Sequence, residues 1–233
     1  MFTPNLFLVL ALSAPSVTTP APASATWTDA GVIAGAAGAL ALMHQQKEPW
    51  SALDWEGTET GQSYKEDYVP TWAMGLTLAG LTAGAATEGG TKEAVTLLQG
   101  TGLTLMLSDL IKYSVGRPRP DYDDRMRIYN AGGQDEKMSW DARLSMPSGH
   151  SAMAMAMAWH TVFWWGRAAC RRGTEASGKP LRWGVPLAVG SAIAYSRFPN
   201  NRHNLSDVAV GSAIGTAVAF AVNHVQFPGG CTR

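Results

Sequence analysis

Six long runs with helical spacing and almost no charge dominate this chain. Apolar residues recur at helical spacing within them, as along the segment that holds Leu97, Leu98, Leu103, Leu105 and Leu110. No segment shows the alternation of apolar and polar residues that is typical of strands. The sequence therefore predicts an all-α fold, a compact bundle whose helices cover about residues 30–46, 69–87, 94–112, 148–169, 183–196 and 205–225.

The connections between these runs are polar and uneven in length. Residues 47–67 are predicted to form an exposed connection. The long segment from Gly116 to Pro147 contains several prolines and glycines, which interrupt helices, and is predicted to be irregular. Loops of this length inside a compact domain are usually functional. With 233 residues in all, we expect one domain over residues 26–233, with its catalytic core at about 94–227.

Composition excludes some partners but leaves the question of a membrane open. Eighteen basic residues balance eighteen acidic ones, so nothing indicates a nucleic-acid partner, and no obligate protein partner is predicted. Only 15% of residues are charged, which is low for a soluble protein. The mean hydropathy of −0.04 is nevertheless low for a chain dominated by membrane spans.

The N-terminal residues 1–25 have the pattern of a secretory signal. An apolar stretch from Leu6 to Leu12 is followed by Ala23-Ser24-Ala25, which predicts cleavage after Ala25. No Lys or Arg precedes the apolar stretch, so an uncleaved anchor or a misassigned start remains an alternative. Export would place Cys170 and Cys231 where they could pair, although two free thiols are an equal alternative.

The first cluster with chemical potential is Lys112-Tyr-Ser-Val-Gly-Arg-Pro-Arg119-Pro120. It places a lysine at a predicted helix end, before a stiff loop that carries arginines. An ammonium and a planar guanidinium are both suited to bind phosphate oxygens. Taken alone, a basic residue at a helix C-terminus is explained as well by the helix dipole.

The second cluster, Pro147-Ser148-Gly149-His150, opens a predicted helix. Ser148 suits an N-cap, Gly149 lets a ligand approach the backbone, and the free amides of the first turn form an anion site. His150 would lie beside a bound anion and could protonate a leaving oxygen. The alternative is a capped helix with a surface histidine.

The third cluster runs from Ser196-Arg197 to His203 and Asp207. Four residues separate His203 from Asp207, so on a helix the two side chains share a face and can form a hydrogen bond. A nucleophilic imidazole needs one free nitrogen and a partner that fixes the other, and a carboxylate can serve as that partner. A local ion pair at a helix start is the alternative.

Together these clusters supply what a histidine phosphotransfer site needs. The chain resembles the type 2 phosphatidic acid phosphatase superfamily, which includes bacterial acid phosphatases, lipid phosphate phosphatases and vanadium haloperoxidases. The pattern of that family is Lys-x6-Arg-Pro, then Pro-Ser-Gly-His, then Ser-Arg-x5-His-x3-Asp. All three parts occur here in order, and the likeness covers residues 112–215.

The resemblance implies a helical bundle with its active site at one end of the core helices. It also implies that His203 is the nucleophile, that Asp207 orients it and that His150 is the acid and later the base. The same resemblance implies phosphate binding by Lys112, Arg119, Ser148, Gly149 and Arg197, with no metal and no other cofactor. The expected substrate is a phosphorylated lipid or a small phosphoester.

Three further points follow from the sequence. Many members of the family have glycine where this chain has Asn201, and asparagine tolerates the left-handed backbone that the turn requires. Arg117, Arg125, Arg127 and Arg143 could extend the basic pocket, but nearby aspartates nearly offset them, which favours a solvated loop. A vanadate-dependent haloperoxidase and a non-catalytic anion-binding membrane protein are the alternative functions.

The sequence supports two cellular settings. Several of the six runs are at or below the ~20 residues that a membrane span needs, but the connection Arg167 to Arg182 holds five basic residues and one acid, as a cytoplasmic loop should. A cleaved signal would leave the following chain outside, which conflicts with six spans and an external active site. We therefore expect a periplasmic helical protein, soluble or membrane-associated, with an integral membrane protein as the alternative.

Overall fold

The computed structural model describes residues 27–43, 45, 49–50, 61–65, 71–132, 136–174 and 178–229. Within these ranges the secondary structure is entirely helical, which confirms the predicted fold class. The predicted signal at residues 1–25 lies outside the described residues. Cys170 is buried near the end of a helix, whereas Cys231 also lies outside them.

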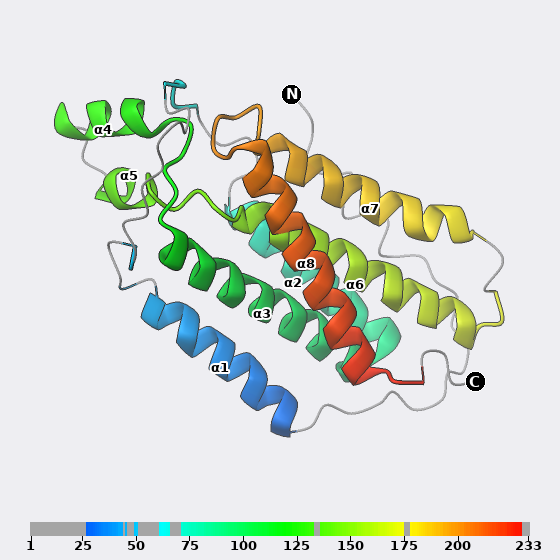
Figure 1. Cartoon of the computed structure of the whole chain (residues 1–233). Helices are drawn as coiled ribbons and strands as arrows, with labels where there is room; N and C mark the ends of the chain where they lie inside the picture. The colour runs from blue at the N-terminus through cyan, green and yellow to red at the C-terminus, as the bar shows by residue number, and fades with distance from the viewer. Residues whose placement is uncertain are drawn as a thin grey trace.

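Eight helices occupy the described residues (Figure 1). Their bounds are α1 Trp27–Met43, α2 Thr71–Gly89, α3 Thr91–Val115, α4 Tyr122–Asn130, α5 Glu136–Asp141, α6 Gly149–Arg171, α7 Lys179–Ser196 and α8 Leu205–Gln226. The six predicted runs correspond to α1, α2, α3, α6, α7 and α8. Among them α1 begins three residues before its predicted start, and α7 begins four residues before.

The segment that the sequence predicts to be irregular contains two short helices, α4 and α5. Asp123 and Asp124 lie in the first turn of α4 and Arg127 lies in its last, an arrangement that the helix dipole favours. Buried Arg125 donates to buried Asp121 at 2.8 Å, one turn away. The prediction of a solvated loop is therefore wrong for Arg125, because the acids beside it pair with it and allow it to be buried.

Helix α6 is the centre of the bundle, packing against α2, α3, α7 and α8. Its approach to α8 depends on two glycines of α8. A Cβ atom at Gly211 would lie 2.4 Å from the Ser148 carbonyl oxygen, and one at Gly215 would lie 2.0 Å from that of Ala152. Only glycine lets the two backbones touch here, so α8 begins directly beside the first turn of α6.

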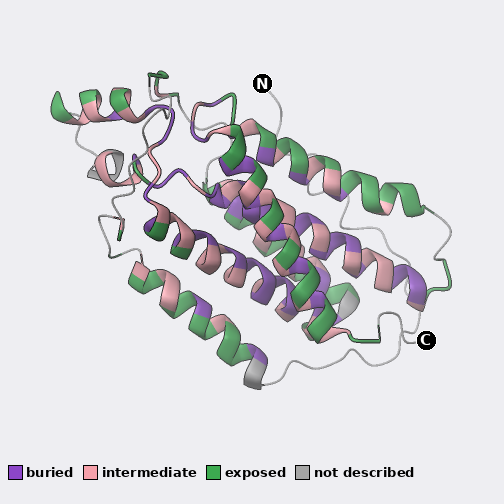
Figure 2. Ribbon diagram, in the orientation of Figure 1, coloured by how far each residue is buried: buried purple, intermediate pink, exposed green. Residues whose placement is uncertain are grey.

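One hydrophobic cluster of the core lies where α6 packs against α2 and α3. Met153, Ala154 and Met157 form a buried cluster with Met74 of α2 and Leu97 of α3. The Met-rich stretch of α6 is therefore used in helix packing. In Figure 2 the buried residues follow α3 and α6, while α1 and α7 expose much of their surface.

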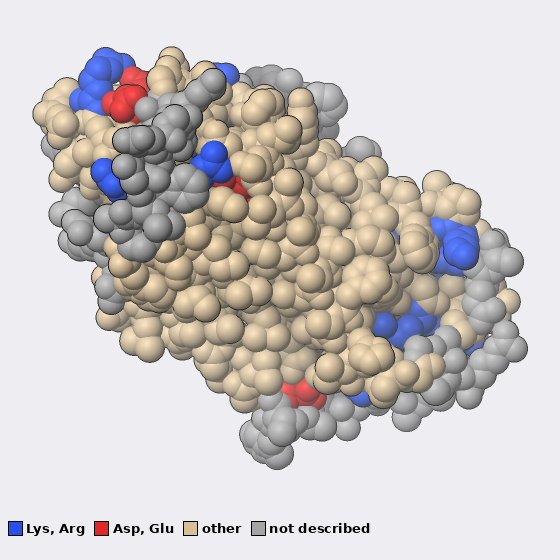
Figure 3. Space-filling model, in the orientation of Figure 1, with Lys and Arg blue, Asp and Glu red and all other residues tan. Residues whose placement is uncertain are grey.

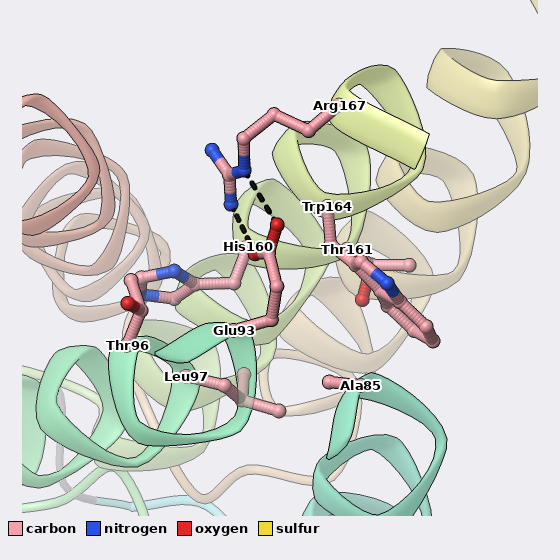
Figure 4. Close-up of a pocket in the computed structure, with 8 residues that line it drawn as sticks. All are labelled: Ala85, Glu93, Thr96, Leu97, His160, Thr161, Trp164 and Arg167. Carbon is pink, nitrogen blue, oxygen red and sulfur yellow. Dashed lines mark hydrogen bonds and ion pairs between the residues drawn. The ribbon is translucent and has the colours of Figure 1, made fainter. Parts of the chain in front are cut away.

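A buried polar cluster lies near the start of α3 and the end of α6 (Figure 4). Arg167 of α6 donates to both carboxylate oxygens of Glu93 in α3, at 2.7 and 2.5 Å. It also donates to Asn223 of α8 at 2.9 Å, and Asn223 contacts His160 of α6 at 2.7 Å. These contacts tie three helices together at the end of α3 that is remote from Lys112.

Two helices of the described chain, α3 and α8, are long and apolar enough to cross a membrane. The buried core helix of a soluble protein would pass the same test. On the face shown in Figure 3, charged side chains gather toward the two ends of the molecule and leave a broad uncharged zone between them. This distribution is compatible with association with a membrane.

Candidate active site

The three sequence clusters meet at one end of the bundle. Helices α3 and α7 end there, and α6 and α8 begin there (Figure 1). Lys112 lies in the last turn of α3, and its ammonium is 3.0 Å from the position of a Cβ atom at Gly149. The fold thus brings a lysine against the first turn of α6, where free backbone amides favour an anion.

Ser148 is the N-cap of α6, as the sequence predicts. Its hydroxyl accepts from the Ser151 amide at 3.4 Å and from the Ser151 hydroxyl at 2.8 Å. The Ser148 amide donates to the Asp207 carbonyl oxygen at 3.0 Å. Ser148 therefore joins the start of α6 to the start of α8, and the next residues, Gly149 and His150, form the first turn at the site.

His203 is buried in the loop before α8, and each of its ring nitrogens has a defined neighbour. Nδ1 lies 2.7 Å from the Ser145 carbonyl oxygen, and Nε2 lies 3.1 Å from Nη1 of Arg119. A carbonyl can only accept and a guanidinium can only donate. We therefore assign the ring proton to Nδ1, which leaves the lone pair of Nε2 directed toward Arg119.

The surroundings of His203 favour its neutral form. Burial lowers the pKa of His203 well below its usual value, and the charges of Arg119, Arg197, Lys112 and His150 lower it further. An imidazole with a low pKa keeps its lone pair at neutral pH. His203 thus combines the tautomer and the charge state that a nucleophile requires.

Arg119 spans the centre of the site. Its Nε and Nη2 donate to the carbonyl oxygen and to Oδ1 of Asp141, at 2.9 and 2.8 Å, and Nη1 donates to the Arg202 carbonyl oxygen at 2.8 Å. Burial raises the pKa of Asp141, but the charges of Arg119 and Arg125 outweigh it and lower that pKa to about 2. Asp141 is therefore ionised and fixes the guanidinium plane.

The remaining predicted cations also converge here. Lys112 pairs with Asp109 at 2.9 Å, one turn earlier in α3. Arg197 is buried at the C-cap of α7 and, like His150, lies close enough to His203 to lower its pKa. The residues of the three clusters that were assigned catalytic or phosphate-binding roles thus lie around one site, and the cations there outnumber the acids that pair with them.

The relation between His203 and Asp207 differs from the expected hydrogen bond. Nδ1 of His203 is 3.9 Å from Oδ2 of Asp207, too far for such a bond. The expectation placed both residues on one helix, whereas α8 begins at Leu205 with Asn204 as its N-cap. Asp207 turns its carboxylate back to the Asn204 amide at 2.8 Å, and the Ser145 carbonyl takes the position beside the imidazole.

Three residues of the site were not assigned roles in it from the sequence: Asp109, Asp141 and Ser145. Asp109 precedes Lys112 by three residues on a helix, a spacing that predicts an ion pair. Asp141 and Ser145 act across long sequence distances, and no local pattern indicates them. Arg117 belongs to the first cluster, and its contact with Asp207 places it beside the site. At Asn201 the backbone has φ 56°, which confirms the left-handed turn expected just before His203.

Comparison with known proteins agrees with this geometry. The family model described as PAP2 superfamily matches residues 93–230, which is more than half of the chain and contains the whole site. The chain belongs to the PAP2 superfamily. No solved structure matches it.

Two curated relatives are similar to a little more than half of the chain. A probable diacylglycerol pyrophosphate phosphatase 1 of Schizosaccharomyces pombe is 30% identical over 151 residues, covering 59% of this chain and 54% of the relative. Phospholipid phosphatase 2 of Rattus norvegicus is 28% identical over 137 residues, covering 53% and 49%. The matched region spans about half the length of these two relatives.

Proposed function

We propose that this PAP2 protein is a metal-independent phosphatase that hydrolyses phosphomonoesters or pyrophosphates of lipid-type substrates through a phosphohistidine on His203. The observation that carries the proposal is the position of Nε2 of His203, which lies 3.1 Å from Nη1 of Arg119 and near the basic groups of Arg197, Lys112 and His150. Names of the relatives support a phosphorylated lipid as the substrate class.

In the proposed first step, Nε2 of His203 attacks phosphorus and the bond from phosphorus to the leaving oxygen breaks. Protonated His150 donates its proton to that oxygen and becomes neutral. In the second step His150 takes a proton from water, whose oxygen attacks the phosphohistidine. The Nε2–phosphorus bond breaks, and inorganic phosphate is released while His203 recovers its lone pair.

The cations have a separate role in this proposal. Nη1 of Arg119 donates to Nε2 of His203 at 3.1 Å, and a phosphoryl oxygen entering the site would take over that hydrogen bond. Lys112, Arg197, Ser148 and the Gly149 amide would bind the other phosphoryl oxygens. Because charge stabilisation provides most of the catalysis in phosphoryl transfer, these donors would supply what a metal ion supplies elsewhere.

A substrate panel tests the proposed function. Full-length protein in detergent is assayed for phosphate release from a diacylglycerol pyrophosphate, a phosphatidate, a polyprenyl pyrophosphate and soluble phosphomonoesters, with and without EDTA. We expect the lipid substrates to have the highest kcat/KM and EDTA to change the rates less than twofold. In cell fractionation, we expect the activity to lie outside the cytoplasm and to sediment with the membranes. Preference for soluble esters, or loss of activity in EDTA, would contradict the corresponding part of the proposal.

The pH dependence of activity follows from the environment of His203. Its pKa lies well below the usual value because of burial and the neighbouring cations, so the nucleophile stays unprotonated as the pH falls. We therefore expect the acid limb of kcat/KM to lie below pH 6.5, after correction for the second ionisation of the substrate phosphate near pH 6. Loss of activity above pH 6.5 on acidification would show that the nucleophile has an ordinary pKa.

A further inference from the structure

The environment of Asp207 points to a positioning role for Ser145, which lies outside the three clusters, and for Arg117, which lies within the first. We propose that Ser145 and Arg117 position His203, and that Asp207 acts on the imidazole through Ser145 while Arg117 balances its charge. This inference rests on the proposed role of His203 as nucleophile. In place of a direct hydrogen bond between His203 and Asp207, the contacts run from Arg117 to Asp207, from Asp207 to Ser145 and from Ser145 to His203. We call this set of four residues the relay.

Ser145 contacts both His203 and Asp207. Its carbonyl oxygen lies 2.7 Å from Nδ1 of His203, and its hydroxyl donates to Oδ2 of Asp207 at 2.6 Å. Ser145 is completely buried, and its amide donates to the Arg117 carbonyl oxygen at 3.0 Å. Two hydrogen bonds thus fix the residue whose carbonyl orients the imidazole. One runs from the Ser145 hydroxyl to Asp207, and the other from the Ser145 amide to the backbone of Arg117.

Asp207 is completely buried and has its charge matched by Arg117. Nη1 of Arg117 donates to Oδ1 of Asp207 at 2.7 Å, and the same nitrogen donates to the Ser206 hydroxyl at 2.7 Å. Oδ2 of Asp207 accepts from Ser145 and from the Asn204 amide. The carboxylate therefore has a cationic partner and several donors without any hydrogen bond to His203.

The charge pattern gives this relay a measurable consequence. Several ionisable groups act on the imidazole of His203: Lys112 of α3, Arg119 of the following loop, His150 of α6, Arg197 at the end of α7 and Asp207 of α8. Four of these are basic groups that oppose protonation of the ring. The carboxylate of Asp207, 3.9 Å from Nδ1, favours protonation of the ring, and Arg117, which pairs with that carboxylate at 2.7 Å, offsets this effect. Removing Arg117 leaves the Asp207 charge uncompensated and stabilises the imidazolium.

The first test compares the acid limb of kcat/KM in wild type and Arg117→Gln. An uncompensated charge within 4–6 Å changes a pKa by about 1–3 units, so we expect the limb to move up by about one unit or more. The double variant Arg117→Gln/Asp207→Asn should return the limb to the wild-type position or below it. Ser206→Ala is the matched control, because it removes the other hydrogen bond of the same Arg117 nitrogen and leaves the charge pair intact.

If the acid limb of kcat/KM in Arg117→Gln lies at the same pH as in wild type, the proposed role of Arg117 is wrong. If this variant does not fold, Arg117→Lys keeps a cation beside Asp207 and should retain the wild-type limb, whereas a shifted limb in a folded Lys variant contradicts the proposal. All variants are compared on one substrate, so the ionisation of the substrate cancels.

The second test separates positioning by Ser145 from binding of phosphate. Ser145→Ala removes the hydroxyl but keeps the carbonyl, so the bond to the imidazole survives while the hold on that carbonyl is weakened. We expect kcat to fall about 10–100-fold, as for loss of positioning around a reacting group, with less than a threefold change in KM and in inhibition by vanadate. Turnover within twofold of wild type overturns the role of Ser145. If His203→Asn is inactive while these variants behave as wild type, only this inference fails.

Discussion

His203→Asn is expected to abolish the phosphoenzyme and to lower kcat/KM by ~10⁴-fold or more, as loss of a catalytic nucleophile does. Asparagine is the chosen substitute because its amide can still donate to the Ser145 carbonyl oxygen, which His203 contacts at 2.7 Å. The change thus removes the lone pair that faces Arg119 and preserves the contact that holds the loop. Phosphate release and trapping of acid-labile, base-stable labelled phosphate on the protein measure the two effects.

The matched control for this variant is His224→Asn. His224 is an exposed histidine in the last turn of α8, far along the helix from the site, and its replacement should leave turnover unchanged. Binding of vanadate, which mimics the transferred phosphate, should survive in part in His203→Asn because the cations remain. Turnover in His203→Asn near that of the control would remove His203 from the mechanism.

The parts of the site that the sequence predicted are those whose spacing is set by one helix end or one short loop. Ser148 reads as an N-cap because it precedes an apolar helix, and the structure confirms that cap. Asn201 reads as a left-handed position, and its φ of 56° confirms that too. Both predictions succeed because their cause is local: a few neighbouring residues decide the backbone conformation.

The parts that the sequence did not predict depend on where a helix begins and on contacts far along the chain. Asn204 and Asp207 form a reciprocal cap at the start of α8, and this places His203 outside the helix. An Asn followed three residues later by an acid is a variant of the capping-box spacing, so this feature could have been read. The contact of Arg117 with Asp207 spans 90 residues and could not.

Charge balance explains why the sequence assigns Arg125 to a solvated loop, whereas Arg127 and Arg143 are exposed as predicted. A count of neighbouring aspartates favours a solvated loop, but such a count does not show which acid each arginine meets. Asp141 pairs with Arg119 at 2.8 Å and with Arg125 at 3.3 Å, so one acid from α5 contacts two arginines from the preceding segment, and Asp121 supplies the second negative charge. Helix α5 thus supports the site through Asp141. Two of the aspartates that favour a solvated loop in the sequence instead form ion pairs with Arg119 and Arg125.

The buried ion pair between α3 and α6 should have the largest effect on stability of the contacts outside the site. Glu93 is almost completely buried, and Arg167 reaches both of its carboxylate oxygens (Figure 4). Breaking such a pair by removing one partner leaves a buried charge without compensation and costs about 3–5 kcal/mol. We therefore expect Glu93→Ala to lower the free energy of unfolding by about that amount, measured by thermal or denaturant unfolding in detergent.

Two further variants show whether the unpaired charge is the cause. Glu88→Ala removes an exposed carboxylate at the end of α2 and should change stability by less than ~0.5 kcal/mol. Glu93→Leu/Arg167→Met replaces the pair with apolar side chains of similar size and should be more stable than Glu93→Ala, because no charge is left buried. Arg167 also lies 3.7 Å from the centre of the Phe227 ring and donates to Asn223, so recovery in the double variant should be partial. A double variant as unstable as Glu93→Ala would mean that lost packing, rather than the buried charge, accounts for the effect.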